Sequence, residues 1–201
     1  MLKRILVPAA LCLFLASCAL RMFPPAFDLG PLQRIGLAEF SVEKAEGPLG
    51  RMATQQFLEE ILRWQRVEVV DLGPLEEALG SVGADRPDRL AYQALGDRYD
   101  VAAVFTGRIL ISDIRPEIDL RNILRRLSVR ARFNIFISAT LVSTDSGGVM
   151  WTRSTEREGE AARLGVGPRG VFDFGLRDQE ENHRRMLQRM VRDITRDFRR
   201  R

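Results

Sequence analysis

Hydrophobic and polar positions alternate most regularly between residues 128 and 143. The odd positions are almost all apolar, whereas most even positions are polar and include Arg130 and Arg132. Because successive side chains of a strand point to opposite faces of a sheet, this period of two predicts a half-buried antiparallel strand with one face in water. A glycine-containing turn at 144–148 then predicts a hairpin, whose returning strand covers about 149–156.

Three shorter apolar runs bounded by turn residues predict further strands at 34–40, 67–71 and 101–114. The third begins with Val-Ala-Ala-Val-Phe, which is typical of a central strand buried on both faces. Pro116 is expected to end this strand, because proline cannot donate a hydrogen bond to a neighbouring strand. The polar residues 41–50 predict a loop.

Helical spacing of apolar residues predicts a long helix that ends at about Trp64 and another over about 179–200. Each has one apolar face and an opposite polar face, as expected of helices that pack on a core. The inner faces consist of Ala53, Phe57, Ile61 and Trp64 in the first helix and of Leu187, Val191, Ile194 and Phe198 in the last.

Two shorter helices are expected between these two. One covers 72–79, with Gly80 as its C-terminal cap, and the other opens at Pro87. The expected inner face of the second comprises Leu90, Ala91, Ala94 and Leu95. Residues 117–127 are compatible with one or two helical turns, and the glycine-rich stretch 157–178 predicts a long flexible loop of a kind that is often functional.

The amino terminus has the residue order of a secretory signal. Lys3 and Arg4 precede an apolar run over 5–15, and Leu15-Ala16-Ser17-Cys18 follows. A membrane-spanning helix needs about 20 apolar residues, roughly twice the length of this run. The sequence therefore predicts a cleaved signal at 1–17 and not a membrane span.

The segment Leu15-Ala16-Ser17-Cys18 resembles the lipobox of bacterial lipoproteins. The resemblance implies that Cys18 receives a diacylglyceryl thioether, becomes the first mature residue and is then N-acylated. An ordinary signal with an incidental cysteine is the alternative. Residues 18–33 are expected to form a lipidated tether and 34–201 an α/β periplasmic domain. Ala19 is not the aspartate that retains many enterobacterial lipoproteins in the inner membrane, which favours the outer membrane and leaves the inner membrane open.

The composition leaves few chemistries open. Removal of 1–17 leaves 184 of the 201 residues, enough for one sizeable core, and lowers the net charge from +4 to about +2. Cys12 leaves with the signal and Cys18 carries lipid, so no disulfide is expected. His183 is the only histidine, and the sequence offers neither a nucleophile with a base nor a set of metal ligands. We therefore expect no enzyme, no cofactor, no metal and no nucleic-acid partner.

The arginines of the last helix are the strongest candidates for contact with a partner. Asp193 and Asp197 are expected to compensate some of them at i, i+4 spacing. The alternative is a solvated face that favours the helix C-terminus electrostatically. The wet face of the 128–143 strand predicts a second basic area. The candidate partner-binding residues are Arg130, Arg132, Arg185, Arg189, Arg192 and Arg196.

Several segments resemble a known group of envelope proteins. They are Ile-Gly-Leu-Ala-Glu-Phe at 35–40, Tyr-Asp-Val-Ala-Ala-Val-Phe-Thr-Gly-Arg-Ile at 99–109 and Asp-Ser-Gly-Gly-Val-Met-Trp-Thr-Arg-Ser at 145–154. The group comprises the curli-secretion lipoproteins, the lipoprotein activators of penicillin-binding proteins and the amino-terminal domain of TolB. The resemblance, over 34–198, implies a single α/β domain with helices packed on a mixed sheet of about five strands and a C-terminal helix. Glu39 departs from the group's pattern, which has proline there.

We therefore expect a non-enzymatic, membrane-anchored periplasmic lipoprotein that binds and supports an envelope assembly or secretion complex. Its partners would be the membrane, through Cys18, and an envelope protein, and a homo-oligomer is compatible with the sequence. The alternative implied by the curli relatives is an oligomeric secretion channel subunit. A pore would need further hairpins with about 9 to 11 residues per strand. The predicted sheet already uses the strands that could form them, so this alternative ranks second.

Overall fold

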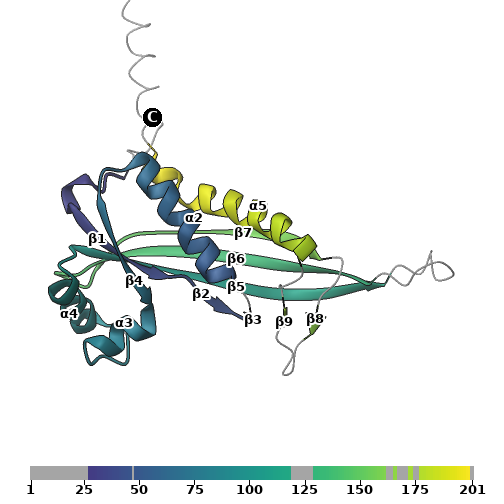
Figure 1. Cartoon of the computed structure of the whole chain (residues 1–201), viewed down its shortest axis with the longest axis horizontal. Helices are drawn as coiled ribbons and strands as arrows, with labels where there is room; N and C mark the ends of the chain where they lie inside the picture. The colour runs from purple at the N-terminus through teal and green to yellow at the C-terminus, as the bar shows by residue number, and fades with distance from the viewer. Residues whose placement is uncertain are drawn as a thin grey trace, which may run out of the picture.

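The sheet is built around β1 (Arg34–Glu39), which pairs in parallel with β4 (Glu68–Pro74) and with β5 (Ala103–Ile118). The sheet continues antiparallel from β5 to β6 (Val129–Ser143) and from β6 to β7 (Val149–Ala161). The strand order is β4-β1-β5-β6-β7, which confirms a mixed sheet (Figure 1). This computed structural model describes residues 27–46, 48–118, 129–161, 165–166, 172–173 and 177–199.

Helices cover both faces of this sheet, as the single α/β domain predicted from the sequence requires. The long helices α2 (Leu49–Trp64) and α5 (Arg177–Ile194) lie on one face, and the short helices α3 (Leu75–Ser81) and α4 (Arg89–Tyr99) lie on the other (Figure 1). Each pair closes its own apolar cluster against the strands. Because β5 contributes to both clusters, it is the central strand that its apolar run predicted.

The apolar periodicities identified the buried faces of β6 and α5 correctly. On β6 the odd positions from Phe133 to Leu141 are buried and face α2 and α5. On α5 the predicted inner residues Leu187, Val191 and Ile194 are fully buried. The fourth member, Phe198, is also buried but belongs to a short 3-10 turn, η3 (Arg196–Phe198), that follows the helix.

Two segments expected as loops contain strands. The stretch 41–50 holds β2 (Ser41–Glu43), which pairs in parallel with β5, and β3 (Ala45–Glu46). The stretch 157–178 holds the end of β7, then β8 (Gly165–Val166) and β9 (Phe172–Asp173), and α5 already begins at Arg177. These pairings join residues far apart in the chain, for example Ser41 with Arg108, so local polarity alone did not predict them.

Several predicted boundaries were wrong for identifiable reasons. Pro116 lies inside β5 opposite Ala131, because a register shift between Ser112 and Arg115 precedes it. Residues 117 and 118 are therefore strand, and 119–127 lie outside the described residues. Strand β4 continues to Pro74, which delays α3. The left-handed turn after α3 is made by Gly83 and not by Gly80.

Two side chains predicted to be inside are outside. Trp64 is 37% exposed because it ends α2, after which the backbone is extended at Gln65. Leu90 is 73% exposed because it stands in the first turn of α4, which is capped by the Asp88 side chain and not by Pro87. The deeper residues Ala91 and Leu95 are buried as expected.

Candidate interaction surface

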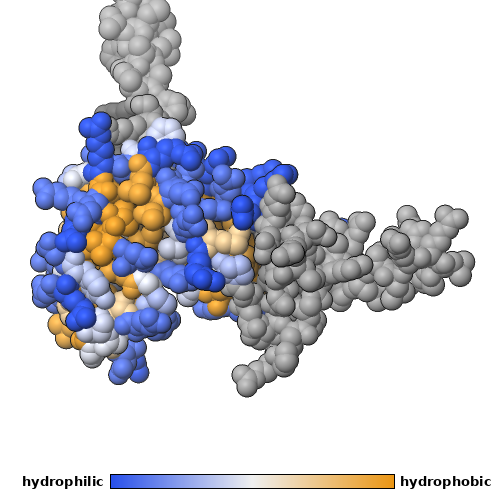
Figure 2. Space-filling view, in the orientation of Figure 1, coloured by the Kyte–Doolittle hydropathy of each residue, from blue (hydrophilic) through white to orange (hydrophobic). Residues whose placement is uncertain are grey.

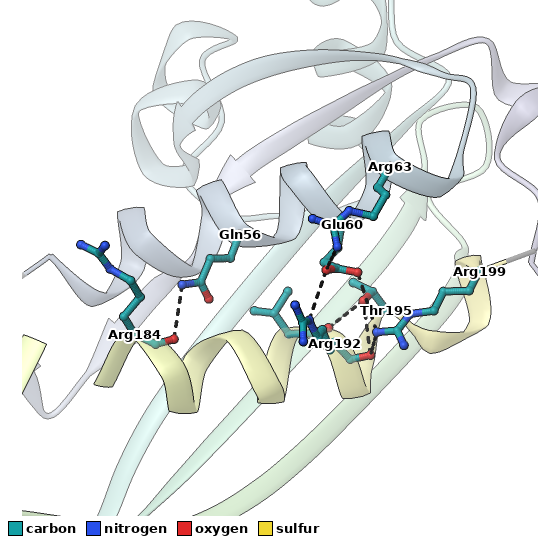
Figure 3. Close-up of polar contacts among 8 residues, drawn as sticks. Gln56, Glu60, Arg63, Arg184, Arg192, Thr195 and Arg199 are labelled. Carbon is teal, nitrogen blue, oxygen red and sulfur yellow. Dashed lines mark hydrogen bonds and ion pairs between the residues drawn. The ribbon is translucent and has the colours of Figure 1, made fainter. Parts of the chain in front are cut away.

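Glu60 organises the contact between α2 and α5. Its side chain is almost buried, at 5% exposure, on the α5 side of α2. Its carboxylate forms ion pairs with Arg63 at 3.0 Å, Arg192 at 3.5 Å and Arg199 at 3.7 Å (Figure 3). One carboxylate therefore holds the two helices and the segment after α5 together, and the candidate residue Arg192 contributes to this packing.

The two acids near the end of α5 bind β7 and not the arginines of their own helix. Asp197 accepts hydrogen bonds from the Trp151 indole nitrogen, at 3.2 Å, and from Arg153. Asp193 pairs with Arg157 at 2.5 Å. The predicted i, i+4 compensation within the helix is therefore wrong. Both acids bind side chains of the sheet, so the outer side of this segment keeps its exposed arginines.

The other candidate arginines fall into two separate places. Arg185, Arg189 and Arg196 are exposed on α5 and η3. Arg132 lies on β6, 3.9 Å from Glu158 of β7. Arg130 pairs through its backbone with Glu117 of β5, and its side chain lies outside the described residues. Since α5 covers the odd face of β6, the even positions face the opposite side, and the two basic areas are not brought together.

Gln65 is a structural residue that the sequence did not single out. It is 5% exposed, and its side-chain oxygen accepts a hydrogen bond from the Leu29 amide at 2.9 Å. Its side-chain nitrogen donates to the carbonyls of Phe27, at 3.3 Å, and Phe198, at 2.5 Å. The start of the described chain and the end of α5 therefore meet at the C-terminal end of α2. The polar side chain at position 65 did not indicate this role, because its bonding partners lie far away along the sequence.

A cavity of about 800 Å³ lies where β1, β4 and β5 begin. Among its lining residues, Arg34 pairs with Glu68 at 3.0 Å and with Asp100 at 3.1 Å. Burial raises the pKa of Tyr92, and a hydrogen bond with Ser81 lowers the pKa of Tyr99, but neither tyrosine lines the cavity.

The described part of the chain contains no group of three or more His, Cys, Asp or Glu side chains placed to hold a metal. Of the helices among the same residues, none combines the length and apolarity needed to cross a membrane. The candidate interaction surfaces are therefore the arginine face of α5 and the end of α2 near Gln65.

No protein-family model and no curated protein matches the chain. Among solved structures it is similar to PelC from Paraburkholderia phytofirmans, described as a dodecamer, with 11% identity and a TM-score of 0.51 over 88% of this chain and 93% of that one. It is also similar to a lipoprotein from Neisseria meningitidis (14% identity, TM-score 0.41, 67% and 88% covered). A third is the C-terminal domain of LpoB from Salmonella enterica (8% identity, TM-score 0.39, 74% and 92% covered). The PelC similarity shows a shared fold.

Proposed function

We propose that this protein is a non-enzymatic lipoprotein of the bacterial envelope, anchored through Cys18 after removal of residues 1–17. The lipobox is the sequence feature that supports the anchor. Phe27 and Leu29 fall inside the stretch 18–33, yet they bind Gln65 of the domain. The tether in this proposal is therefore the nine residues 18–26, shorter than the sequence implied.

The domain binds and supports an envelope assembly or secretion complex through the exposed side of α5. The observation that carries this proposal is that Asp193 and Asp197 bind side chains of β7, while Arg189 and Arg196 stay exposed on the same segment. Such a surface speeds encounter with an acidic partner and orients it. The alternative is a solvated face that stabilises the end of the helix.

Site-specific photocrosslinking in the native cell distinguishes these alternatives. A photoreactive residue placed at Arg189 is expected to crosslink an envelope protein that mass spectrometry can identify. The same residue at Arg86, an exposed arginine in the connection between α3 and α4, is the control. Equal crosslinking patterns at both positions would show that the α5 face is only a solvated surface.

The anchor places the domain on the periplasmic side of the outer membrane, with Ala19 after the lipid site supporting this location over the inner membrane. Cys18→Ser is expected to move the protein from the membrane fraction to the soluble periplasm. Sucrose-gradient separation of the two membranes then locates the wild-type protein. Retention of the Cys18→Ser protein in a membrane fraction would place the anchor elsewhere.

A second candidate function is that of a ring-forming subunit in a secretion channel, as in the curli-secretion group. The observation favouring it is the shared fold with PelC, which is described as a dodecamer. The mass of the detergent-extracted, lipidated protein by native mass spectrometry tests it. A discrete assembly of many copies would support this second function, and a monomer at all concentrations would contradict it.

A further inference from the structure

The last turn of α2 exposes two large apolar side chains. Leu62 is 51% exposed and Trp64 is 37% exposed, although both belong to a helix whose other face is fully buried. Val67 and Val69, on the adjacent edge of the sheet, are only partly covered. Figure 2 shows apolar surface beside α2 in the upper part of the molecule. This surface is unusual for a protein that would tumble freely in water.

Cationic side chains stand close to this apolar surface. Arg66 follows the end of α2 and is exposed, and Arg196 is exposed at the start of η3. The two segments are joined through Gln65, whose side chain binds the Phe198 carbonyl. Tryptophan, leucine and arginine gathered at one end of the molecule form a combination that suits a membrane interface: the aromatic ring lies at headgroup level and the guanidinium groups pair with anionic lipids.

The described part of the chain begins at the same end of the molecule. Gln65 fixes Phe27 there, and only the eight residues 19–26 separate Phe27 from the lipid site at Cys18. At full extension the nine steps from Cys18 to Phe27 reach about 30 Å. A lipid on Cys18 would hold Leu62 and Trp64 near the bilayer at all times. Because the tether gives these side chains a high effective concentration at the membrane, even a weak affinity for lipid would suffice for docking.

We propose that Leu62, Trp64, Arg66 and Arg196, here called the anchored end, dock on the surface of the bilayer that carries the Cys18 lipid. The inference rests on the proposed lipid anchor and adds an orientation to it. Docking would fix the domain on the membrane and point the far end of its sheet into the periplasm. The anchored end shares Arg196 with the α5 face, whose other exposed arginines, Arg185 and Arg189, lie farther back along α5, which extends away from this end (Figure 1).

Tryptophan fluorescence can test this orientation in the full lipidated protein. Trp64 and Trp151 are the two tryptophans of the chain, and Trp151 is buried and bonded to Asp197. In vesicles of phosphatidylethanolamine and phosphatidylglycerol with brominated acyl chains, wild-type emission is expected to be quenched. Trp64→Phe should abolish the quenching and leave the Trp151 emission. Because Trp64 is partly exposed at a helix end, this substitution should leave the fold intact.

Neutralising the arginines tests the electrostatic part of the contact. The double variant Arg66→Gln/Arg196→Gln should shift the docked population roughly fivefold for each arginine, the equivalent of about 1 kcal/mol per cation at an anionic surface. Arg86→Gln, an exposed arginine on the opposite side of the sheet, should leave quenching unchanged. Equal quenching in all three proteins would overturn the electrostatic role of the anchored end.

The outcomes separate failure of the inference from failure of the anchor. Lipidated protein that co-sediments with vesicles but shows no bromolipid quenching would overturn the docked orientation and leave the anchor standing. Protein that does not co-sediment would overturn the anchor itself. Protection of Trp64 from aqueous iodide that rises with protein concentration, without bromolipid quenching, would show a second copy on this surface and also overturn the inference.

Discussion

Glu60 places a charge inside the contact of two helices, and its removal is the most direct test of that packing. Glu60→Gln keeps the shape but loses the charge shared by Arg63, Arg192 and Arg199. Since these arginines are partly exposed, the expected loss in the free energy of unfolding is about 1 to 2 kcal/mol. Urea unfolding of the mature chain carrying Cys18→Ser measures it.

The exposed neighbour Glu59 provides the matched control. Its carboxylate meets only Gln55 of the same helix, at 3.3 Å, among the described contacts. Glu59→Gln should therefore change the free energy of unfolding by less than about 0.5 kcal/mol. If Glu60→Gln is equally neutral, the ion pairs of Glu60 add nothing to stability and Arg192 is available to a partner.

Gln65 is expected to be more costly to replace, because its three bonding partners are backbone groups. Gln65→Leu leaves the Leu29 amide and the carbonyls of Phe27 and Phe198 without this partner. The bonds to Leu29 and Phe198 are the buried ones, and at about 1 to 3 kcal/mol for each buried group left unpaired a total loss of about 2 to 6 kcal/mol is expected. Hydrogen exchange at the Leu29 amide should quicken. Gln93→Leu, which loses one exposed bond to Asp145, is the control, and equal effects of the two would contradict this role.

Both residues show where sequence patterns lose information. Glu60 and Gln65 are polar, and polarity on or after an amphipathic helix normally indicates exposure. Their burial depends on Arg199, Phe27 and other partners that are distant along the chain. Apolar periodicity, in contrast, is a local property, and it identified the buried residues of β6 and α5 correctly.

At the scale of elements, the glycines of the sheet determine how closely the neighbouring segments approach. The Phe40 ring lies where a β-carbon on Gly107 of β5 would be. The same ring contacts Phe57 of α2, and Phe57 contacts Phe105 of β5, so a residue larger than glycine at position 107 would displace this aromatic cluster. Gly107→Ala should lower the free energy of unfolding by about 1 to 3 kcal/mol. Gly80→Ala, in α3 with open space around it, should raise it by about 0.5 to 1 kcal/mol. Thermal unfolding that ranks the two variants in the reverse order would contradict this packing.

The elements that the sequence predicted poorly are those made by long-range pairing. Strand β2 is three residues long and polar, and it is held by its register with β5 and by the Arg108–Glu43 ion pair at 2.7 Å. Pro116 is tolerated in β5 only because a register shift precedes it. Neither feature can be recognised from the neighbouring residues in the sequence. The alternation at 128–143 can, because it follows from the pleat of a single strand.

At the scale of the whole molecule, the sheet decides which charges can act together. The sequence placed Arg132 and Arg189 in one set of candidates, but it does not say which helices cover which face. Because α5 lies over the odd positions of β6, Arg132 faces the other side. A single flat partner therefore cannot contact both.

The anchor and the α5 face together predict that membrane attachment is part of partner binding. A tether of nine residues raises the effective concentration of the domain at the membrane to about the millimolar range. Cys18→Ser should therefore reduce crosslinking from Arg189 in cells by about 100-fold or more, although the purified domain should bind the identified partner with unchanged affinity. Quantitative crosslinking at matched expression and titration of the soluble protein measure the two quantities. Undiminished crosslinking by the released Cys18→Ser protein would mean that the lipid determines location only, because the affinity of the α5 face alone would then suffice.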